Sequence, residues 1–336
     1  MTNQTNNIRV GLIGAGRMGS FHARLLRHFV KGADLVAIAD PNLSNAQKLA
    51  KELVISTIYD KPENLINNPN IDAVVIAVPA RFHAQTAIQA AQAGKAVFCE
   101  KPMALTLEDA DNVIAAAEKA NVVLQVGFNR RFAAGFLAAH NEILAGNIGS
   151  PQLIRSLTRD PKLNDPAPIP QWTIYYETLI HDFDTILYFN PNAKPISVYA
   201  VADALVRPDY KEKGLLDTSV VTIRFDNGAI ATAEANFQAL YGYDVRAEVF
   251  GSKGMVTAGD ARQNNMLRFT KDGVSYDTCR MDTELLKDAY QAELTSFIDC
   301  IKYRKKTLVG GKEAKAALAI ALACIESVKT GQAVNL

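Results

Sequence analysis

Hydrophobic and polar positions in the first 128 residues alternate between two kinds of segment. Short, almost continuously apolar runs, such as IRVGLIG (8–14), IDAVVIAVP (71–79) and AVFCEKP (96–102), alternate with longer segments that carry apolar residues at helical spacing. Buried apolar strands that alternate with amphipathic helices are typical of a parallel sheet covered by helices on both faces. Residues 1–128 are therefore predicted to form an α/β domain of this type.

The pattern changes beyond residue 128. After one more helix, six strand-like segments follow, several of them alternating in polarity and joined by short turns such as DNG and GSKG: 152–160, 196–203, 219–225, 229–237, 245–251 and 254–259. Such segments predict a large, open, mostly antiparallel sheet. Two late helices are expected at 288–302 and 312–331. Residues 129–336 are predicted to form a second α/β domain, and the proline-rich DPAPIP (165–170) a loop over the domain junction.

The composition narrows the classes of protein. With 336 residues, of which 49% are hydrophobic, the chain can bury two cores. Lys plus Arg (36) nearly equals Asp plus Glu (35), which argues against a nucleic-acid-binding protein. The four cysteines form no CxxC pair, so neither a zinc site nor a disulfide framework is expected. The polar start MTNQTNN and the lack of an apolar run near about 20 residues favour a cytoplasmic protein without a membrane partner.

The segment GLIGAGRMG predicts a phosphate-binding turn. Gly14, Gly16 and Gly19 form GxGxxG between a strand and a helix, where glycines allow a tight turn, close approach to a pyrophosphate and close packing. Asp40 follows Gly19 by 21 residues, at the end of the second strand, where a carboxylate can accept from both ribose hydroxyls. The same carboxylate would repel a 2′-phosphate, and neither of the next two residues supplies a compensating positive charge. The first domain is predicted to bind a dinucleotide, with NAD preferred over NADP.

Lys101 ends a predicted strand in the segment FCEKP. Ligands of open α/β sheets bind beyond the carboxyl ends of the strands, so this lysine is expected near the reactive end of the cofactor. There its ammonium group can stabilise an alkoxide or transfer a proton to it. The alternative is a lysine that simply reaches solvent at a strand end.

The segment ETLIHDFD (177–184) places Glu177 and His181 four residues apart ahead of an apolar run. One interpretation is a solvated helix start, where acids suit the positive end of the helix dipole. The other is a proton relay, because a carboxylate on the same helix face can orient an imidazole and stabilise its charged form. Asp182 and Asp184 are expected to be helix-start and structural residues.

Several motifs occur in the order found in one family of enzymes. The chain resembles the Gfo/Idh/MocA oxidoreductases in GLIGAGRMGSFHA, AVPARFHA, CEKPMALT, QVGFNRRF, TRDP and IHDFD, the last three being most like the inositol 2-dehydrogenase branch. The resemblance implies a Rossmann domain followed by an open-faced α/β domain, and NAD(P) as cofactor. It also implies a polyol or sugar as substrate and a homotetramer. SVVTIRF (219–225) and AIATAEANF (229–237) would then contribute an uncovered sheet face to the subunit interface.

Site residues follow from the resemblance position by position. The catalytic group falls on Lys101, His181 and Glu177, where His181 would accept the substrate proton and no metal is required. The cofactor-binding residues are Gly14, Gly16, Arg17, Met18, Gly19, Asp40, Val78, Pro79, Glu100 and Lys101. The substrate-binding residues are Lys101, Arg130, Asp160, Glu177, His181 and Tyr290. Three of these have structural alternatives: Arg130 as a domain bridge, Asp160 as a loop cap and Tyr290 as a core residue.

The chain also departs from the inositol dehydrogenase pattern. KLND (162–165) intervenes after TRDP, PQWTIYYE (170–177) replaces a glycine pair, and glutamate stands at position 177, where aspartate is usual. Trp172, Tyr175 and Tyr176 are expected to reshape the substrate wall. The predicted function is NAD-dependent oxidation of a secondary hydroxyl of an inositol-like polyol or sugar. The alternatives are a sugar oxidoreductase that retains its nicotinamide and a non-catalytic NAD-binding sensor.

Overall fold

The computed structural model describes residues 7–162 and 170–336, which divide into two compact units. The first contains the chain up to Asn129 together with Asp288–Lys315, and the second contains Arg130–Lys287 and Ala316–Leu336. The predicted boundary at 128/129 lies beside the first crossing, but the predicted second domain also included residues 288–315, which pack with the first unit. Most of the predicted loop 165–170 lies outside the described residues.

The first unit is built on a six-stranded parallel sheet in the order β3-β2-β1-β4-β5-β6. Its strands are β1 (Ile8–Ile13), β2 (Ala33–Ala39), β3 (Thr57–Tyr59), β4 (Ala73–Ile76), β5 (Ala96–Cys99) and β6 (Leu124–Val126). The order reverses between β1 and β4, and ligands of such sheets bind at the carboxyl ends beside this reversal. The predicted parallel α/β domain is confirmed.

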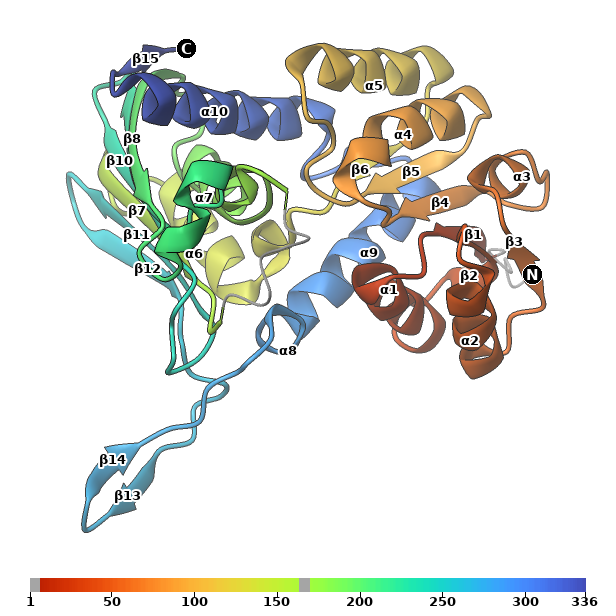
Figure 1. Cartoon of the computed structure of the whole chain (residues 1–336), viewed down its shortest axis with the longest axis horizontal. Coiled ribbons are helices and arrows are strands. Elements are labelled where there is room, and N and C mark those ends of the chain that lie inside the picture. The colour runs from red at the N-terminus through yellow and green to blue at the C-terminus, as the bar shows by residue number, and fades with distance from the viewer. Residues whose placement is uncertain (1–6, 163–169) are drawn as a thin grey trace. The chain divides into compact units, whose positions relative to one another are not determined.

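Helices cover the parallel sheet of the first unit (Figure 1). They are α1 (Arg17–His28), α2 (Leu43–Leu53), α3 (Pro62–Ile66), α4 (His83–Gln92), α5 (Leu107–Ala120) and α9 (Lys287–Tyr303), with a 3-10 turn η1 (Ala80–Phe82) before α4. Helix α5 begins at Leu107 because the Thr106 hydroxyl accepts the amide hydrogen of Asp109, a stabilising N-cap. It ends at the left-handed Asn121.

The second unit is built on a mixed seven-stranded sheet in the order β12-β11-β7-β10-β9-β8-β15. Its strands are β7 (Pro151–Arg159), β8 (Pro195–Asp203), β9 (Thr218–Phe225), β10 (Ile230–Asn236), β11 (Asp244–Gly251), β12 (Met255–Gly259) and β15 (Val334–Asn335). Every neighbouring pair is antiparallel except β10 with β7, so the predicted mostly antiparallel sheet is confirmed.

The two faces of this sheet differ in burial. Helices α6 (Ala134–Leu144), α7 (Ile180–Phe189) and α10 (Gly311–Thr330) lie on one side of it (Figure 1). On the opposite face, register pairs join four exposed apolar residues into a row across β10, β7, β11 and β12. Ile230, Leu153, Phe250 and Met255 in this row are 43% to 55% exposed. One face of the sheet therefore presents a continuous apolar strip.

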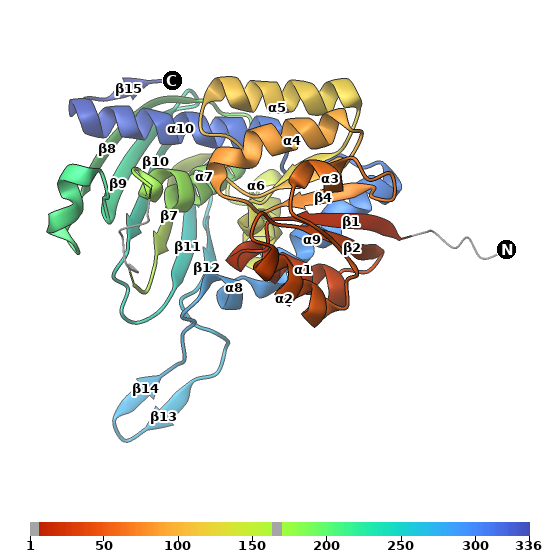
Figure 2. The ribbon, with the colours of Figure 1, turned by 45° about the vertical axis from the view of Figure 1, so that its right-hand side comes forward.

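The remaining elements of the second unit were not predicted from the sequence. They are 3-10 turns η2 (Asn129–Phe132) and η4 (Pro208–Lys213), the π-helix η3 (Ile174–Leu179), the short helix α8 (Asp282–Leu285), and the strands β13 (Arg268–Thr270) and β14 (Gly273–Ser275). The β13–β14 hairpin extends away from the seven-stranded sheet (Figures 1 and 2). Its cross-strand pair of Phe269 and Val274 is largely exposed.

Candidate active site

The turn between β1 and α1 requires glycine at two positions for steric reasons. Gly14 has φ +98°, and a Cβ atom there would lie 2.5 Å from the carbonyl oxygen of Ala77. A Cβ atom at Gly19 would lie 1.8 Å from the carbonyl oxygen of Gly14. The predicted roles of these glycines in a tight turn and in close packing therefore agree with the geometry.

Gly16 differs from the other two glycines because it faces open space. A Cβ atom there would meet nothing within 4 Å, and the residue is exposed at the N-cap of α1. The first turn of α1 contains no acidic residue, so its unpaired amides and the helix dipole favour an anion. The turn thus fits the pyrophosphate of a dinucleotide, with backbone amides as the binding groups.

Asp40 follows β2 and connects it to the phosphate turn. Its Oδ2 accepts the amide hydrogen of Ala15 at 2.6 Å, and its Oδ1 accepts that of Asn42 at 2.8 Å. The half-buried carboxylate therefore shapes the turn in addition to the ribose contact that the sequence predicts.

The segments that follow β4 and β5 begin side by side, because Ile76 pairs with Cys99. The first of these segments carries Val78 and Pro79, and the second carries Glu100 and Lys101. Lys101 is half-buried, and its peptide bond to Pro102 is cis. Two predicted cofactor contacts and the predicted catalytic lysine thus lie beyond the carboxyl ends of adjacent strands, where the sequence placed them.

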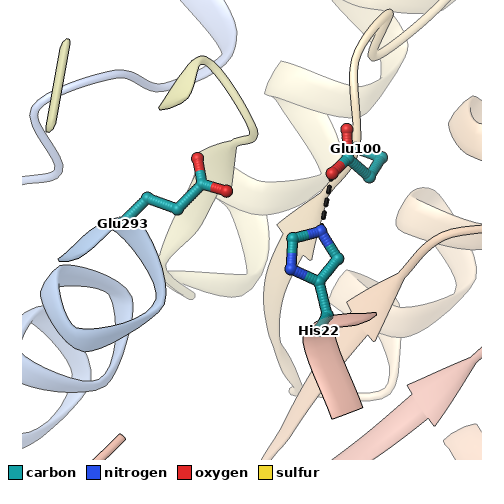
Figure 3. A group of neighbouring side chains, drawn as sticks. All are labelled: His22, Glu100 and Glu293. Carbon is teal, nitrogen blue, oxygen red and sulfur yellow. Dashed lines mark hydrogen bonds and ion pairs between the residues drawn. The ribbon is translucent and has the colours of Figure 1, made fainter. Parts of the chain in front are cut away.

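A buried cluster lies behind Lys101 in the first unit. His22 comes from α1, Glu100 from the end of β5 and Glu293 from α9, and Figure 3 shows the Glu293 carboxylate turned toward the other two. The Nε2 of His22 lies 2.6 Å from Oε1 of Glu100, and Oε2 of Glu100 accepts the amide hydrogen of Lys101 at 3.1 Å. The glutamate, predicted as a cofactor contact, therefore uses both oxygens to hold neighbouring parts of its own unit.

The three side chains of this cluster are of the kinds that bind divalent metals, and one ligand atom from each lies within 4.8 Å of the others. Burial and the nearby charge of Glu100 raise the pKa of Glu293 well above its ordinary value, which favours its protonated form. The closest contact in the cluster is the direct His22–Glu100 hydrogen bond. The sequence did not predict this cluster.

Tyr290 belongs to the same buried region of the first unit. Only 5% of its surface is exposed, and its ring makes edge contacts with Phe21 and His22 at centroid distances of 5.3 and 5.9 Å. This environment supports the alternative of a core residue. Substrate contact by Tyr290 remains a prediction.

Glu177 and His181 lie on a helical segment of unusual geometry in the second unit. Residues Ile174–Leu179 form a π-helix that continues directly into α7, so Glu177 lies in the wider turns and His181 near the start of α7. Both side chains are half-buried. Single π-helical turns recur at functional sites because they displace side chains from the regular helical positions. The alternative interpretation of 177–184 as a solvated helix start does not fit the structure, because the helical turns of η3 precede these residues.

Arg130 and Arg131 each pair with an acid of α7. Arg130 donates from Nη1 to Oδ1 of Asp182 at 2.7 Å, and this carboxylate also accepts from the hydroxyls of Ser156 and Thr158 at 2.6 and 2.7 Å. Arg131 binds both oxygens of Asp184 at 2.9 and 2.7 Å. All four charged residues of the two pairs are buried. Asp182 and Asp184 are structural, as expected, and a structural role is also favoured for Arg130, whose partner Asp182 lies in the same unit.

Two other residues of the second unit have defined surroundings. The backbone of Asp160 pairs with Asn236 and Ala239, and burial, together with the nearby Asp160 carboxylate, raises the pKa of Tyr243 well above its ordinary value. The loop-cap and substrate-contact interpretations of Asp160 both remain predictions. Tyr175 is fully buried and shares a hydrogen bond of 2.9 Å with Ser219. Tyr175 is thus a core residue and not part of a substrate wall.

The four cysteines are free and buried in the described part of the chain. Burial raises the pKa of Cys99, Cys279, Cys300 and Cys324, which makes each thiol a poor nucleophile. Among residues 7–162 and 170–336, no helix is both long and apolar enough to cross a membrane.

Comparison with known proteins extends over almost the whole chain. The sequence profile of an oxidoreductase family with an NAD-binding Rossmann fold matches residues 8–128, and that of its C-terminal alpha/beta domain matches residues 141–336. Myo-inositol 2-dehydrogenase of Thermotoga maritima is 34% identical over 334 residues, which cover 98% of each chain. The NAD(+)-dependent scyllo-inositol 2-dehydrogenase of Bacillus subtilis is 33% identical, over 98% of this chain and 97% of the relative.

Solved structures give the same result. The crystal structure of scyllo-inositol dehydrogenase from Lactobacillus casei with bound NAD(H) and scyllo-inositol matches with a TM-score of 0.91 and 26% identity. The match covers 98% of this chain and 99% of that one. Since both domains match in sequence and the fold matches throughout, the chain belongs to the Gfo/Idh/MocA family of NAD-binding oxidoreductases.

Proposed function

We propose that the protein is an NAD-dependent dehydrogenase that oxidises a secondary hydroxyl of an inositol-like cyclic polyol or sugar to a ketone. The observation that carries this proposal is the phosphate turn joined to Asp40, with Lys101 beyond the carboxyl end of a neighbouring strand. Two relatives that match nearly the full length are named as inositol 2-dehydrogenases, which supports a cyclic polyol as substrate.

In the proposed reaction, the substrate loses a proton from its hydroxyl and a hydride from the adjacent carbon. His181 accepts the proton, and Glu177 orients the imidazole ring and stabilises its charged form. Lys101 stabilises the negative charge that develops on the substrate oxygen. NAD accepts the hydride when bound. Glycines 14, 16 and 19, with Arg17, Met18, Val78 and Pro79, form the proposed cofactor contacts.

Glu177 and the aromatic residues that precede it are proposed to influence substrate recognition. Glu177 has one methylene more than the aspartate usual in the inositol dehydrogenase pattern, and half-buried Trp172 and Tyr176 stand near it in the chain. These differences favour a substrate that is related to inositol but differs in ring substitution. Arg130, Asp160 and Tyr290 remain proposed substrate contacts, although their surroundings favour support of the fold.

The proposed assembly is a homotetramer in the cytoplasm. The apolar strip of Ile230, Leu153, Phe250 and Met255 is larger than scattered exposed residues would produce, and a second subunit can bury it. Four buried free cysteines suit a reducing compartment. Light scattering at micromolar concentration tests the assembly. A monomeric mass would contradict it, and Leu153→Glu together with Phe250→Glu should weaken a true interface.

A panel of inositol isomers, hexoses and sugar derivatives, followed by NADH absorbance, tests the proposed reaction. NADH formation with a cyclic polyol is the expected result. Analysis of cofactor bound to the purified protein distinguishes a dehydrogenase that releases NADH from an oxidoreductase that retains it. A protein that binds NAD but forms no NADH with any member of the panel would be the sensor, and the proposal would fail.

A further inference from the structure

His83 makes two hydrogen bonds that a neutral histidine cannot make at the same time. It is the first residue of α4 and is 2% exposed. Its Nδ1 lies 2.7 Å from the carbonyl oxygen of Pro102, and its Nε2 lies 2.7 Å from that of Val78. Carbonyl oxygens only accept, whereas a neutral imidazole has one N–H and one lone pair. Both contacts are favourable only when both ring nitrogens carry protons.

The two carbonyl groups belong to the segments that follow β4 and β5. Val78 lies two residues beyond Ile76, and Pro102 lies three residues beyond Cys99, the end of the adjacent strand. One ring therefore cross-links the segment of the proposed cofactor contacts to the segment of Lys101. A functional side chain keeps its position only when hydrogen bonds and packing around it hold its segment in place.

A buried imidazolium needs a compensating negative charge. Glu100 supplies it: although burial acts to raise the pKa of this carboxyl, the hydrogen bond from His22 and the charges of His22, Lys101 and His83 lower it. Glu293 adds no second charge, because burial and Glu100 raise its pKa. Glu100, drawn in Figure 3 with His22 and Glu293, is thus the one carboxylate of this group that carries a negative charge for the positive charges of His22, Lys101 and His83.

We propose that His83 is a positioning residue, an imidazolium at neutral pH that ties the segment after β4 to the segment after β5 and so fixes the backbone of Lys101. Its effect on turnover rests on the proposed catalytic role of Lys101. Its charge and its effect on the Lys101 backbone do not rest on that role.

The charge is measured directly on the ring. The chain has 5 histidines, so a two-dimensional ¹⁵N–¹H spectrum of the wild-type side chains can be assigned by single substitutions. His83 should show the pattern of two protonated nitrogens at neutral pH. The pattern of a neutral ring, with one unprotonated nitrogen, would overturn the proposal, whatever the activity of the enzyme.

The positioning is measured with His83→Gln, whose amide can donate to one carbonyl group but not to both. Selective ¹⁵N-lysine labelling, assigned with Lys101→Arg, should show a shifted Lys101 amide resonance. Turnover should fall by about tenfold, because a misplacement near 1 Å can cost up to about 10²-fold. His28→Gln removes an exposed histidine at the end of α1 and should change neither quantity.

Two results separate this inference from the proposed function. If His83→Gln leaves the Lys101 amide in place, the positioning role is wrong, even when turnover falls. If the amide moves and turnover does not, while Lys101→Met is also fully active, the clamp stands and the catalytic role of Lys101 is wrong. Should His83→Gln fail to fold, the wild-type ring spectrum alone decides the charge on which the proposal depends.

Discussion

The two units bury carboxylates in different ways. In the second unit, Asp182 and Asp184 each pair with an arginine that is also buried, at 2.7 Å. In the first unit, Glu100 is bound by a histidine and a backbone amide, and Glu293 is held neutral beside it. Arginine stays protonated in proteins, so the charges of the arginine–aspartate pairs in the second unit are fixed. The histidine and glutamates of the first unit are groups that can gain or lose protons. The arginine–aspartate pairs of the second unit therefore stabilise the fold, whereas the glutamates of the first unit lie beside the segment that carries the proposed catalytic Lys101.

The largest expected effect is on turnover and concerns Lys101 of the first unit. Lys101→Met should lower kcat by about 10² to 10⁴-fold, because the ammonium group stabilises charge that develops in the transition state. The NAD dissociation constant, followed by NADH fluorescence, should change little. Lys48→Met, at an exposed position of α2, is the control. Near-normal turnover of Lys101→Met would remove the lysine from the mechanism.

A large loss of stability is expected when a buried arginine–aspartate pair of the second unit is broken. Asp184→Ala leaves the Arg131 guanidinium buried without its carboxylate, which should lower the free energy of unfolding by about 3–5 kcal/mol. Denaturant titration measures this. Asp209→Ala breaks a similar arginine pair at the surface and should leave the midpoint in place. Equal denaturation midpoints for the two variants would show that the buried Arg131–Asp184 pair stabilises the fold no more than the exposed pair does.

Substitution of Glu177 tests whether this half-buried carboxylate of the second unit takes part in catalysis. Glu177→Gln should lower kcat by about tenfold or more, because the amide cannot stabilise a charged imidazole. Glu177→Asp should recover part of the rate. Glu212→Gln changes an exposed glutamate of the same unit and serves as the control. A loss well below tenfold, without recovery in the aspartate variant, would make Glu177 a structural residue.

Asp40 should influence cofactor choice more than turnover. The wild-type enzyme should prefer NAD, and Asp40→Asn should narrow the ratio of kcat/KM for NAD to that for NADP by about tenfold. Asparagine keeps one acceptor oxygen, for the amide of either Ala15 or Asn42, and presents an NH2 group to the other, so the substitution removes the charge and one hydrogen bond of the turn. A wild-type enzyme with higher kcat/KM for NADP would refute the assignment.

The smallest effect concerns Glu293 and depends on pH. Because its pKa is raised in the folded state, the unfolded chain loses this proton at lower pH than the folded chain does. The wild type should therefore lose stability relative to Glu293→Gln as pH rises from about 4 toward neutrality. Thermal midpoints at several pH values measure the difference. A wild type that gains stability relative to Glu293→Gln as pH rises would indicate that Glu293 is ionised in the folded chain.

Much of the fold was predictable because it depends on local pattern. Helix α5 is an example, since its cap Thr106, its apolar spacing and its left-handed end at Asn121 all lie within or directly beside the segment Leu107–Ala120. The glycines of the phosphate turn, Asp40 after β2 and Lys101 after β5 were also placed correctly relative to their strands. The histidines of SFHA and RFHA stand within motifs of the family resemblance, a signal that could have pointed to His22 and His83, but neither was predicted as a site residue.

The features that were missed depend on contacts between distant segments. Residues 288–315 pack with the first unit, although they follow the second in the chain, and this return brings Glu293 to His22 and Glu100. Likewise, the π-helix that carries Glu177, and the pairing of Arg130 with Asp182, have no local signature. By itself the sequence determined the elements, the dinucleotide turn and the family, because periodicity and short-range sterics decide these. Only the tertiary structure decided which charges are paired and which groups hold protons, because burial and partners set the ionisation of a side chain.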